Sequence, residues 1–272
     1  MFDFFKKKND AVPIFGALGT DMHCHLVPGV DDGSKSFEES KSCIQTMWSV
    51  GYRKMYITPH FQFPRFQNDE GDIATRYQSL VDELHQSGVE MEFVGVGGEY
   101  RIDDGFSSRM ENPKFLTLKD NRLLVELSLH QPRMGLEETL FDLQMKGYEL
   151  ILAHPERYPY LSSNSTQLER LKEMGVMFQV NVLSLGGFYG EVSRREGYKM
   201  IGNGWVELLG TDMHNLMYAD ALRRTSHDKR VQKLLEKVEF QNKNKDVIID
   251  KILYFDDRKG TTEVEIAMQY TD

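Results

Sequence analysis

Two histidines and an aspartate alternate in the segment Asp21-Met-His23-Cys-His25. Residues two apart on a β-strand share a face, so these three side chains would point one way and Cys24 the other. Two imidazoles that converge at a strand end make half of a metal site. Asp21 would either orient one of these histidines or form a plain hydrogen bond at the strand end. One such pair is a common pattern, so its meaning depends on the other strand ends.

Ionisable side chains recur where short apolar runs along the chain end. Besides His23 and His25, they are Asp31, Asp32, His60, Glu99, Glu126, His154, Asp212 and His214. Five of the eight histidines fall in such places, whereas His85 and His227 are interpreted as solvated and His130 stays unassigned. Imidazole and carboxylate ligands suit Mn²⁺, Fe²⁺ or Zn²⁺, and the set is too large for one ion. Bridging carboxylates such as Glu126 and Asp212 would hold ions about 3.5–4 Å apart, which favours phosphoester hydrolysis.

Seven apolar runs and the amphipathic stretches between them must position these groups. The runs occupy residues 19–25, 54–60, 92–99, 123–128, 148–154, 176–181 and 205–214. Helical periodicity covers 37–51, 72–88, 136–147 and 166–175, each ending in glycine, and continues over 218–225 and 228–255. Strand–helix alternation predicts a parallel sheet with helices outside, and seven units favour a closed barrel. In such barrels the reactive groups lie at the carboxyl ends of the strands.

Composition excludes several classes of protein. The chain has 272 residues and a net charge of −9, which argues against nucleic acid as a partner. Two cysteines make no disulfide framework, and no apolar run reaches the roughly 20 residues that span a bilayer. We therefore expect a cytoplasmic protein with at most peripheral membrane contact through its Phe- and Lys-rich start.

Its predicted parts are a leader (1–18), one barrel domain (19–255) and a tail (256–272).

Six motifs resemble those of a known superfamily. D-M-H-C-H-L-V-P-G-V-D-D-G, I-T-P-H-F, G-G-E, V-E-L, A-H-P-E-R-Y and T-D-M-H-N occur in that order between about residues 19 and 250. They resemble the PHP (polymerase and histidinol phosphatase) superfamily, and within it the metal-dependent protein-tyrosine phosphatases of bacterial capsule and exopolysaccharide loci. The resemblance implies a distorted TIM-like (β/α)7 barrel, which is an α/β fold, with two or three divalent ions. Manganese is the ion expected, with iron, zinc or magnesium as alternatives.

The resemblance also implies roles for individual residues. The metal ligands would be His23, His25, Asp32, His60, Glu99, Glu126, His154, Asp212 and His214, with Glu126 and Asp212 shared between ions and Asp31 structural. Arg157 would bind phosphate, oriented by Glu156, and would act in catalysis together with Asp212. Arg101 would be a further substrate contact or a rim salt bridge. Relatives often carry a second arginine shortly after D-x-H-N, but here residues 216–220 are Leu-Met-Tyr-Ala-Asp, and Arg223 and Arg224 come later.

The expected reaction is hydrolysis of phosphotyrosine by a metal-bound hydroxide. The partner implied is the tyrosine-rich tail of a membrane-associated bacterial tyrosine kinase that controls polysaccharide synthesis. Loops 62–71 and 186–190 would line an aromatic substrate or serve as ordinary loops. The alternatives are a phosphatase for histidinol phosphate or another small phosphomonoester, and a kinase-binding adaptor without activity. An amidohydrolase would place lysine where Glu126 stands. A cysteine phosphatase needs arginine six residues after its thiolate, where Cys24 and Cys43 have Val30 and Ser49.

Overall fold

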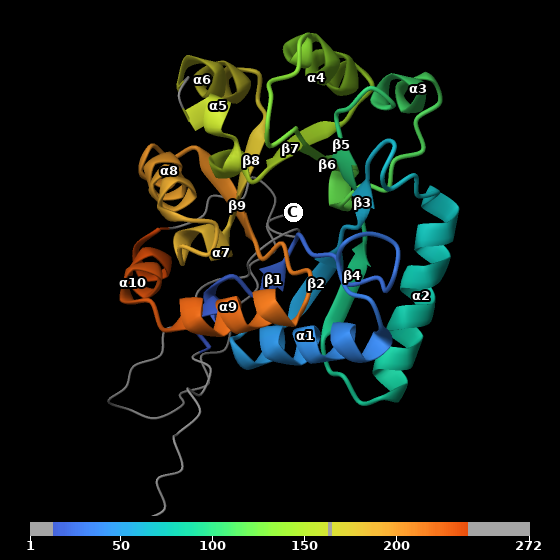
Figure 1. The fold of residues 1–272 in the computed structure, drawn as a ribbon, viewed down its shortest axis with the longest axis vertical. Helices are drawn as coiled ribbons and strands as arrows, with labels where there is room; N and C mark the ends of the chain where they lie inside the picture. The colour runs from blue at the N-terminus through green and yellow to red at the C-terminus, as the bar shows by residue number, and fades with distance from the viewer. Residues whose placement is uncertain (1–12, 163–164, 239–272) are drawn as a thin grey trace, which may run out of the picture.

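The computed structural model describes residues 13–162 and 165–238, in which strands and helices alternate along the chain. Figure 1 shows the strands gathered centrally and the helices in a ring around them. The predicted tail, residues 1–12 of the predicted leader, and the predicted helix beyond residue 238 lie outside the described residues. Leader residues 13–18 include a 3₁₀ turn, Ile14–Ala17, and they bury Phe15 and Leu18 in the core.

All strand pairs within the sheets are parallel. The strands are β1 (Thr20–Asp21), β2 (Lys54–Ile57), β3 (His60–Phe61), β4 (Glu92–Val96), β5 (Glu99–Arg101), β6 (Arg122–Glu126), β7 (Glu149–Ala153), β8 (Met177–Asn181) and β9 (Val206–Gly210). They pair in the orders β1-β2-β4 and β3-β5-β6-β7-β8-β9. The parallel α/β prediction is confirmed, since βαβ crossovers are what connect such strands.

Two of the seven predicted runs are broken, which turns seven strand units into nine short strands. β2 and β3 are halves of one run interrupted before His60, where Pro59 has no N–H to donate. β4 and β5 are halves of the next, interrupted at Gly98, where a Cβ would lie 2.5 Å from the Tyr100 ring. Backbone hydrogen bonds still join the two broken runs to each other, because Gly97 N donates to Ile57 O and Glu99 N donates to Pro59 O, both at 2.9 Å.

Backbone hydrogen bonds also join the first and last units. Asp212 N donates to His23 O, and His25 N donates to Met213 O, each at 2.8 Å. Thr58 N donates to Cys24 O at 2.7 Å, which ties the first unit to the second. The seven units therefore form one distorted ring, as the sequence predicts.

Ten helices cover this ring within the described part of the chain. They are α1 (Phe37–Ser49), α2 (Glu70–Gln86), α3 (Phe106–Glu111), α4 (Leu136–Met145), α5 (Pro159–Ser162), α6 (Ser165–Glu173), α7 (Val182–Leu185), α8 (Glu191–Gly202), α9 (Leu216–Ser226) and α10 (Lys229–Lys237). The glycine stops predicted for α1, α2, α4 and α6 are confirmed by positive φ angles at Gly51, Gly88, Gly147 and Gly175. The sequence did not predict α3, α5, α7 or α8. Among the described residues no helix is both long and apolar enough to cross a membrane.

Candidate metal centre

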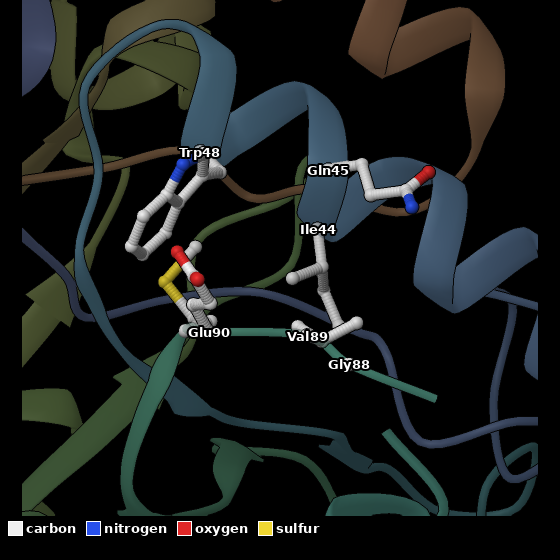
Figure 2. Close-up of a pocket in the computed structure, with 7 residues that line it drawn as sticks. Ile44, Gln45, Trp48, Gly88, Val89 and Glu90 are labelled. Carbon is white, nitrogen blue, oxygen red and sulfur yellow. The ribbon is translucent and has the colours of Figure 1, made fainter. Parts of the chain in front are cut away.

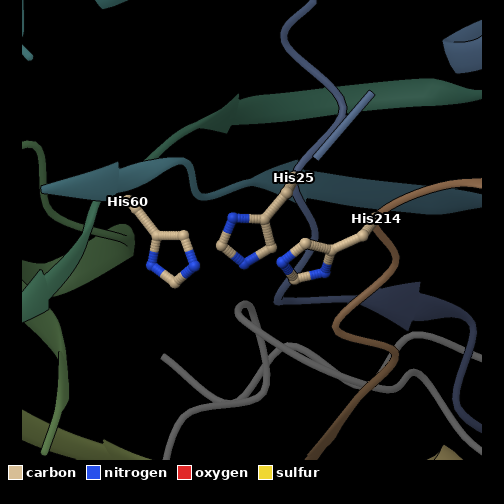
Figure 3. A group of neighbouring side chains, drawn as sticks. All are labelled: His25, His60 and His214. Atoms are coloured by element: carbon tan, nitrogen blue, oxygen red, sulfur yellow. The ribbon is translucent and has the colours of Figure 1, made fainter. Parts of the chain in front are cut away.

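The predicted ligands meet at one end of the barrel because parallel strands present their carboxyl ends at the same edge. His23 and His25 follow β1, and Glu99 and Glu126 lie on β5 and β6. Figure 3 shows the rings of His25, His60 and His214 close together, although they come from three separate segments. Eight of the nine predicted ligands occur in groups that could hold a metal ion, and the ninth, Asp32, lies beside them.

Three ligand atoms form a triangle of the size that a metal ion needs. His23 Nε2 lies 3.1 Å from His25 Nε2, and Asp212 Oδ1 lies 3.3 Å from His25 Nε2 and 3.5 Å from His23 Nε2. Ligands at about 2.0–2.1 Å from an ion are about 2.8–3.0 Å apart in octahedral geometry and about 3.3–3.4 Å apart in tetrahedral geometry. The three atoms therefore stand at ligand spacing around one point.

Glu99 lies between two neighbouring ligand groups. Its Oε1 is 3.0 Å from His154 Nε2 and 3.3 Å from His23 Nε2, while its Oε2 is 2.9 Å from His60 Nδ1. Glu126 Oε1 is 3.4 Å from the same His60 atom. The two Glu99 oxygens thus face different groups of candidate ligands, so Glu99 could be shared between ions.

A third group lies nearer the surface. Asp32 Oδ1 is 3.4 Å from His60 Nε2 and 3.6 Å from His214 Nε2. The Asp32 side chain is 37% exposed, whereas the Glu99 side chain is fully buried. The cluster therefore opens to solvent at Asp32.

Several buried atoms of the cluster contact one another without forming a hydrogen bond. Five buried atoms of the cluster make no hydrogen bond with any described residue: Asp32 Oδ1, His60 Nδ1, Glu99 Oε2, Glu126 Oε1 and His154 Nδ1. A buried polar atom without a partner costs about 1–3 kcal/mol. Ligation of divalent cations would satisfy the carboxylate oxygens and ring nitrogens that face the cluster, so these residues fit a metal centre.

The histidine tautomers suit metal binding because the Nδ1 atoms of both histidines after β1 already have hydrogen-bond partners. His23 Nδ1 lies 2.8 Å from Gln179 Oε1, and His25 Nδ1 lies 2.9 Å from Asp31 Oδ2. We assign a proton to each Nδ1 on these partners, which leaves each Nε2 lone pair facing the cluster. Asp31 also accepts a hydrogen bond from His60 N, so its contacts fit the structural role expected for it.

Asp212 presents only one oxygen to the histidines. Its Oδ2 accepts hydrogen bonds from Arg157 Nη1 and Asn181 Nδ2, both at 2.8 Å, and from the Tyr189 hydroxyl at 3.1 Å. Burial alone would raise the pKa of Asp212, but His214 and His23 outweigh it and hold that pKa well below its usual range. The carboxylate is therefore ionised and fixed, with Oδ1 aimed at His23 and His25.

The two acidic residues on β5 and β6 differ in charge. Burial opposes ionisation of Glu99, but His23 and His60 lower its pKa well below the usual value. Burial, and then the Glu99 charge, raise the pKa of Glu126 to about 7. Glu99 is thus the fixed anion of the centre, and a cation beside Glu126 would complete its ionisation.

Two of the predicted ligands, at strand ends, adopt a backbone conformation that is rare outside glycine. φ is +36° at His154 and +54° at Asp212. This left-handed conformation turns the chain directly after β7 and β9, next to the buried cluster. Strained residues of this kind cluster at functional sites.

The arginines predicted to contact substrate lie at the edge of the cluster. The Arg157 guanidinium stacks over the Tyr189 ring at 4.1 Å, and its side chain is 18% exposed. Arg101 Nη1 lies 3.5 Å from Glu126 Oε1. Arg223 bonds instead to Asp220 and Thr46, on the side of α1.

Three other residues considered in the sequence, Asp21, Glu156 and Cys24, form hydrogen bonds that fix the local backbone or point away from the cluster. Asp21 accepts hydrogen bonds from Thr211 N at 2.7 Å and Thr211 Oγ1 at 2.8 Å, so it forms the strand-end bond rather than orienting a histidine. Glu156 accepts from Ser184 Oγ at 2.6 Å and Asn181 N at 3.1 Å, which fixes the turn that carries Arg157. The Cys24 thiol donates to a backbone oxygen outside the cluster, as its predicted direction requires.

Gln179, Asn181 and Tyr189 were not among the predicted site residues. Gln179 and Asn181 are fully buried amides two apart on β8, so they share a face and bond to each other at 2.9 Å. Two amides, two residues apart in an otherwise apolar run, are a sequence pattern that could have identified these residues. Tyr189 lies in loop 186–190, which was considered only as a rim.

A separate hollow lies away from this cluster. It has a volume of about 170 Å³ and is lined by α1 and the turn after α2, including Ile44, Trp48, Val89 and Glu90 (Figure 2). Its mainly apolar lining offers no group of metal ligands, so we place the candidate chemistry at the strand ends.

The fold and the site together define a parallel α/β barrel with a metallohydrolase type of centre at the carboxyl ends of its strands. Residues 19–251 match the family described as "Capsular polysaccharide synthesis, CpsB/CapC". The chain belongs to this family. This family agrees with the capsule-locus phosphatase branch of the PHP superfamily that the sequence motifs resemble.

Two curated relatives are tyrosine-protein phosphatases. CpsB of Streptococcus pneumoniae is 30% identical over 203 residues, which cover 72% of this chain and 83% of CpsB. YwqE of Bacillus subtilis is 27% identical over 219 residues, which cover 80% and 84%. This chain thus spans most of both relatives.

Solved structures support the fold. A chain from the crystal structures of YwqE and CpsB, described as unique metal-dependent tyrosine phosphatases, superposes with a TM-score of 0.68 at 23% identity and covers 80% of this chain and 91% of that one. The lactonase Lmo2620 of Listeria monocytogenes gives 0.51 at 11% identity, covering 82% and 92%. At these identities the likeness concerns the fold alone.

Proposed function

We propose that this chain is a metal-dependent protein-tyrosine phosphatase of bacterial capsule or exopolysaccharide synthesis. The observation that carries the proposal is the cluster of nine predicted ligands, eight of them buried, with Arg157 fixed beside Asp212, in a chain of the CpsB/CapC family. The proposed ions are two or three divalent cations, with manganese as the native metal. The proposed location is the cytoplasm, and the proposed substrate is the phosphotyrosine tail of a membrane-associated tyrosine kinase.

Each part of the site has a defined task in this hydrolysis. Bound cations would activate water and neutralise charge on the phosphoryl oxygens. Gln179 and Asp31 bond to the Nδ1 atoms of His23 and His25, which would leave both Nε2 atoms available to the ions. Arg157 offers its remaining N–H donors to the phosphate, because only Nη1 is used on Asp212. Phenolate is a stable enough leaving group to depart without a strong general acid.

Exposed apolar residues that closely follow two predicted ligands in sequence favour an aromatic ester over a small polar one. Phe63 is 52% exposed and lies three residues beyond His60, and Leu216 and Met217, 48% and 59% exposed, follow His214 closely. Such a rim suits the ring of a tyrosine within a peptide. Histidinol phosphate would leave it uncovered.

The test compares substrates on one manganese-loaded preparation. We expect hydrolysis of a phosphotyrosine peptide to exceed that of histidinol phosphate, and Asp212→Asn to abolish both. A preference for histidinol phosphate would select the small-ester alternative. Kinase binding by a wild-type protein that carries metal but hydrolyses neither substrate would select the adaptor.

A further inference from the structure

A tight turn, Gln62–Asn68, carries Arg65 over the exposed side of the cluster. Arg65 Nη2 lies 3.4 Å from Asp32 Oδ2, and the other Asp32 oxygen faces His60 and His214. The Arg65 side chain is 61% exposed. Its guanidinium therefore lies between solvent and the outermost ligand group.

The turn is held in place by its own bonds and by those of its neighbours. Gln62 N donates to Phe66 O at 2.9 Å, and Phe66 N donates to Gln62 O at 2.6 Å. Phe63 N donates to Asp103 Oδ2 at 2.7 Å, and Asn68 Nδ2 donates to His60 O at 2.7 Å. Because both ends and the tip are bonded, the backbone of Arg65 has a fixed position.

A stack of planar groups connects Arg65 to the cluster. The Phe66 ring lies parallel to the His60 ring, with an interplanar angle of 5° and centroids 5.6 Å apart. The Arg65 guanidinium lies 4.6 Å from the Phe66 centroid. The aromatic face attracts the cation without using its N–H donors, which stay available to a ligand.

Three arginines surround the cluster, and each faces a different carboxylate. Arg157 pairs with Asp212 and Arg101 with Glu126, at 18% and 19% exposure of the arginine side chain. Arg65 is far more exposed, and its partner Asp32 is the most open acid of the cluster. Arg65 can therefore turn toward a phosphate arriving from solvent without leaving a buried carboxylate unpaired.

We propose that Arg65 is a second phosphate-binding residue, acting opposite Arg157, and that Phe66 holds its guanidinium ready. The phosphate dianion of the substrate would then lie between two guanidinium groups that approach from different elements of the barrel. This inference deepens the proposed function and rests on it for the identity of the ester, although the phosphate contact can be measured separately.

The test measures inorganic phosphate binding to the manganese-loaded protein by calorimetry, together with bound manganese. Arg65→Ala should weaken phosphate binding about ten- to a hundredfold, because a hydrogen bond to a charged group is lost, and should leave bound manganese unchanged. Arg65→Lys should restore part of the affinity. The matched control is Arg76→Ala, which removes an exposed arginine that is paired with Asp72 on α2.

Two results would overturn this role. Unchanged phosphate affinity in Arg65→Ala would show that the arginine does not contact phosphate, and loss of manganese would show that it only supports Asp32. Substrate assays keep the two proposals apart. If the wild-type protein binds phosphate through Arg65 but does not hydrolyse a phosphotyrosine peptide, the proposed function fails and the phosphate contact stands.

Discussion

Removal of divalent ions should destabilise the whole barrel, because it leaves buried carboxylate oxygens of the cluster without a hydrogen bond. Five buried atoms there lack a hydrogen-bond partner among the described residues. The three carboxylate oxygens among them, at about 1–3 kcal/mol each, cost the metal-free state about 3–9 kcal/mol before local relaxation.

The linkage between metal binding and folding gives an independent value for this stabilisation. An ion present at 100 times its Kd stabilises the folded state by about 2.7 kcal/mol. A domain of this size gains about 2–4 °C in Tm per kcal/mol. One ion should therefore raise Tm by about 5–11 °C, and two ions by about twice as much.

The assay is thermal unfolding of chelated and manganese-reloaded protein, with bound metal measured in each sample. His25→Ala should reduce the manganese-induced shift, because His25 Nε2 lies within 3.4 Å of both Asp212 Oδ1 and Glu99 Oε2. His85→Ala is the control, since His85 is exposed on α2. Equal Tm values for fully chelated and reloaded wild type would refute the reasoning from unpaired atoms.

Three further predictions concern single side chains. Arg157→Lys keeps the charge but loses the planar fork, so kcat/KM on a phosphotyrosine peptide should fall about ten- to a hundredfold at unchanged manganese content; loss of metal would contradict this. Tyr189→Phe removes a hydroxyl that bonds to Asp212 but keeps the ring beneath Arg157, so activity should fall about two- to tenfold, and Tyr189→Ala should cost more. Burial raises the pKa of the Cys43 thiol to about 12, so iodoacetamide at pH 8 should leave activity intact, and inactivation would reopen a cysteine mechanism.

Local patterns were enough to predict the ring and the ligand positions. Apolar runs ending in polar residues indicate strand ends, and parallel strands must bring those ends to one edge, so His23 and Glu126 could be expected together. The glycine after each predicted helix set its end, as at Gly88.

Features that depend on distant contacts could not be predicted in the same way. The break at Gly98 arises from the packing of Phe61 and Tyr100 rings against the backbone. Helix α8 has an interior glycine and few apolar residues, so its periodicity is weak. The role of Tyr189 depends on Asp212, which reaches it only after the barrel closes.

The left-handed backbone at His154 and Asp212 lowers the stability of the fold, whereas the side chains at these positions serve the proposed reaction. Aspartate and histidine adopt this conformation more readily than most residues, but glycine does so without a steric cost, so glycine there would relieve about 1 kcal/mol of strain. A lineage that retained the barrel but no longer needed its reaction would gain by such changes. Loss of activity would then begin at these two positions and leave behind a more stable, inactive descendant of the same shape.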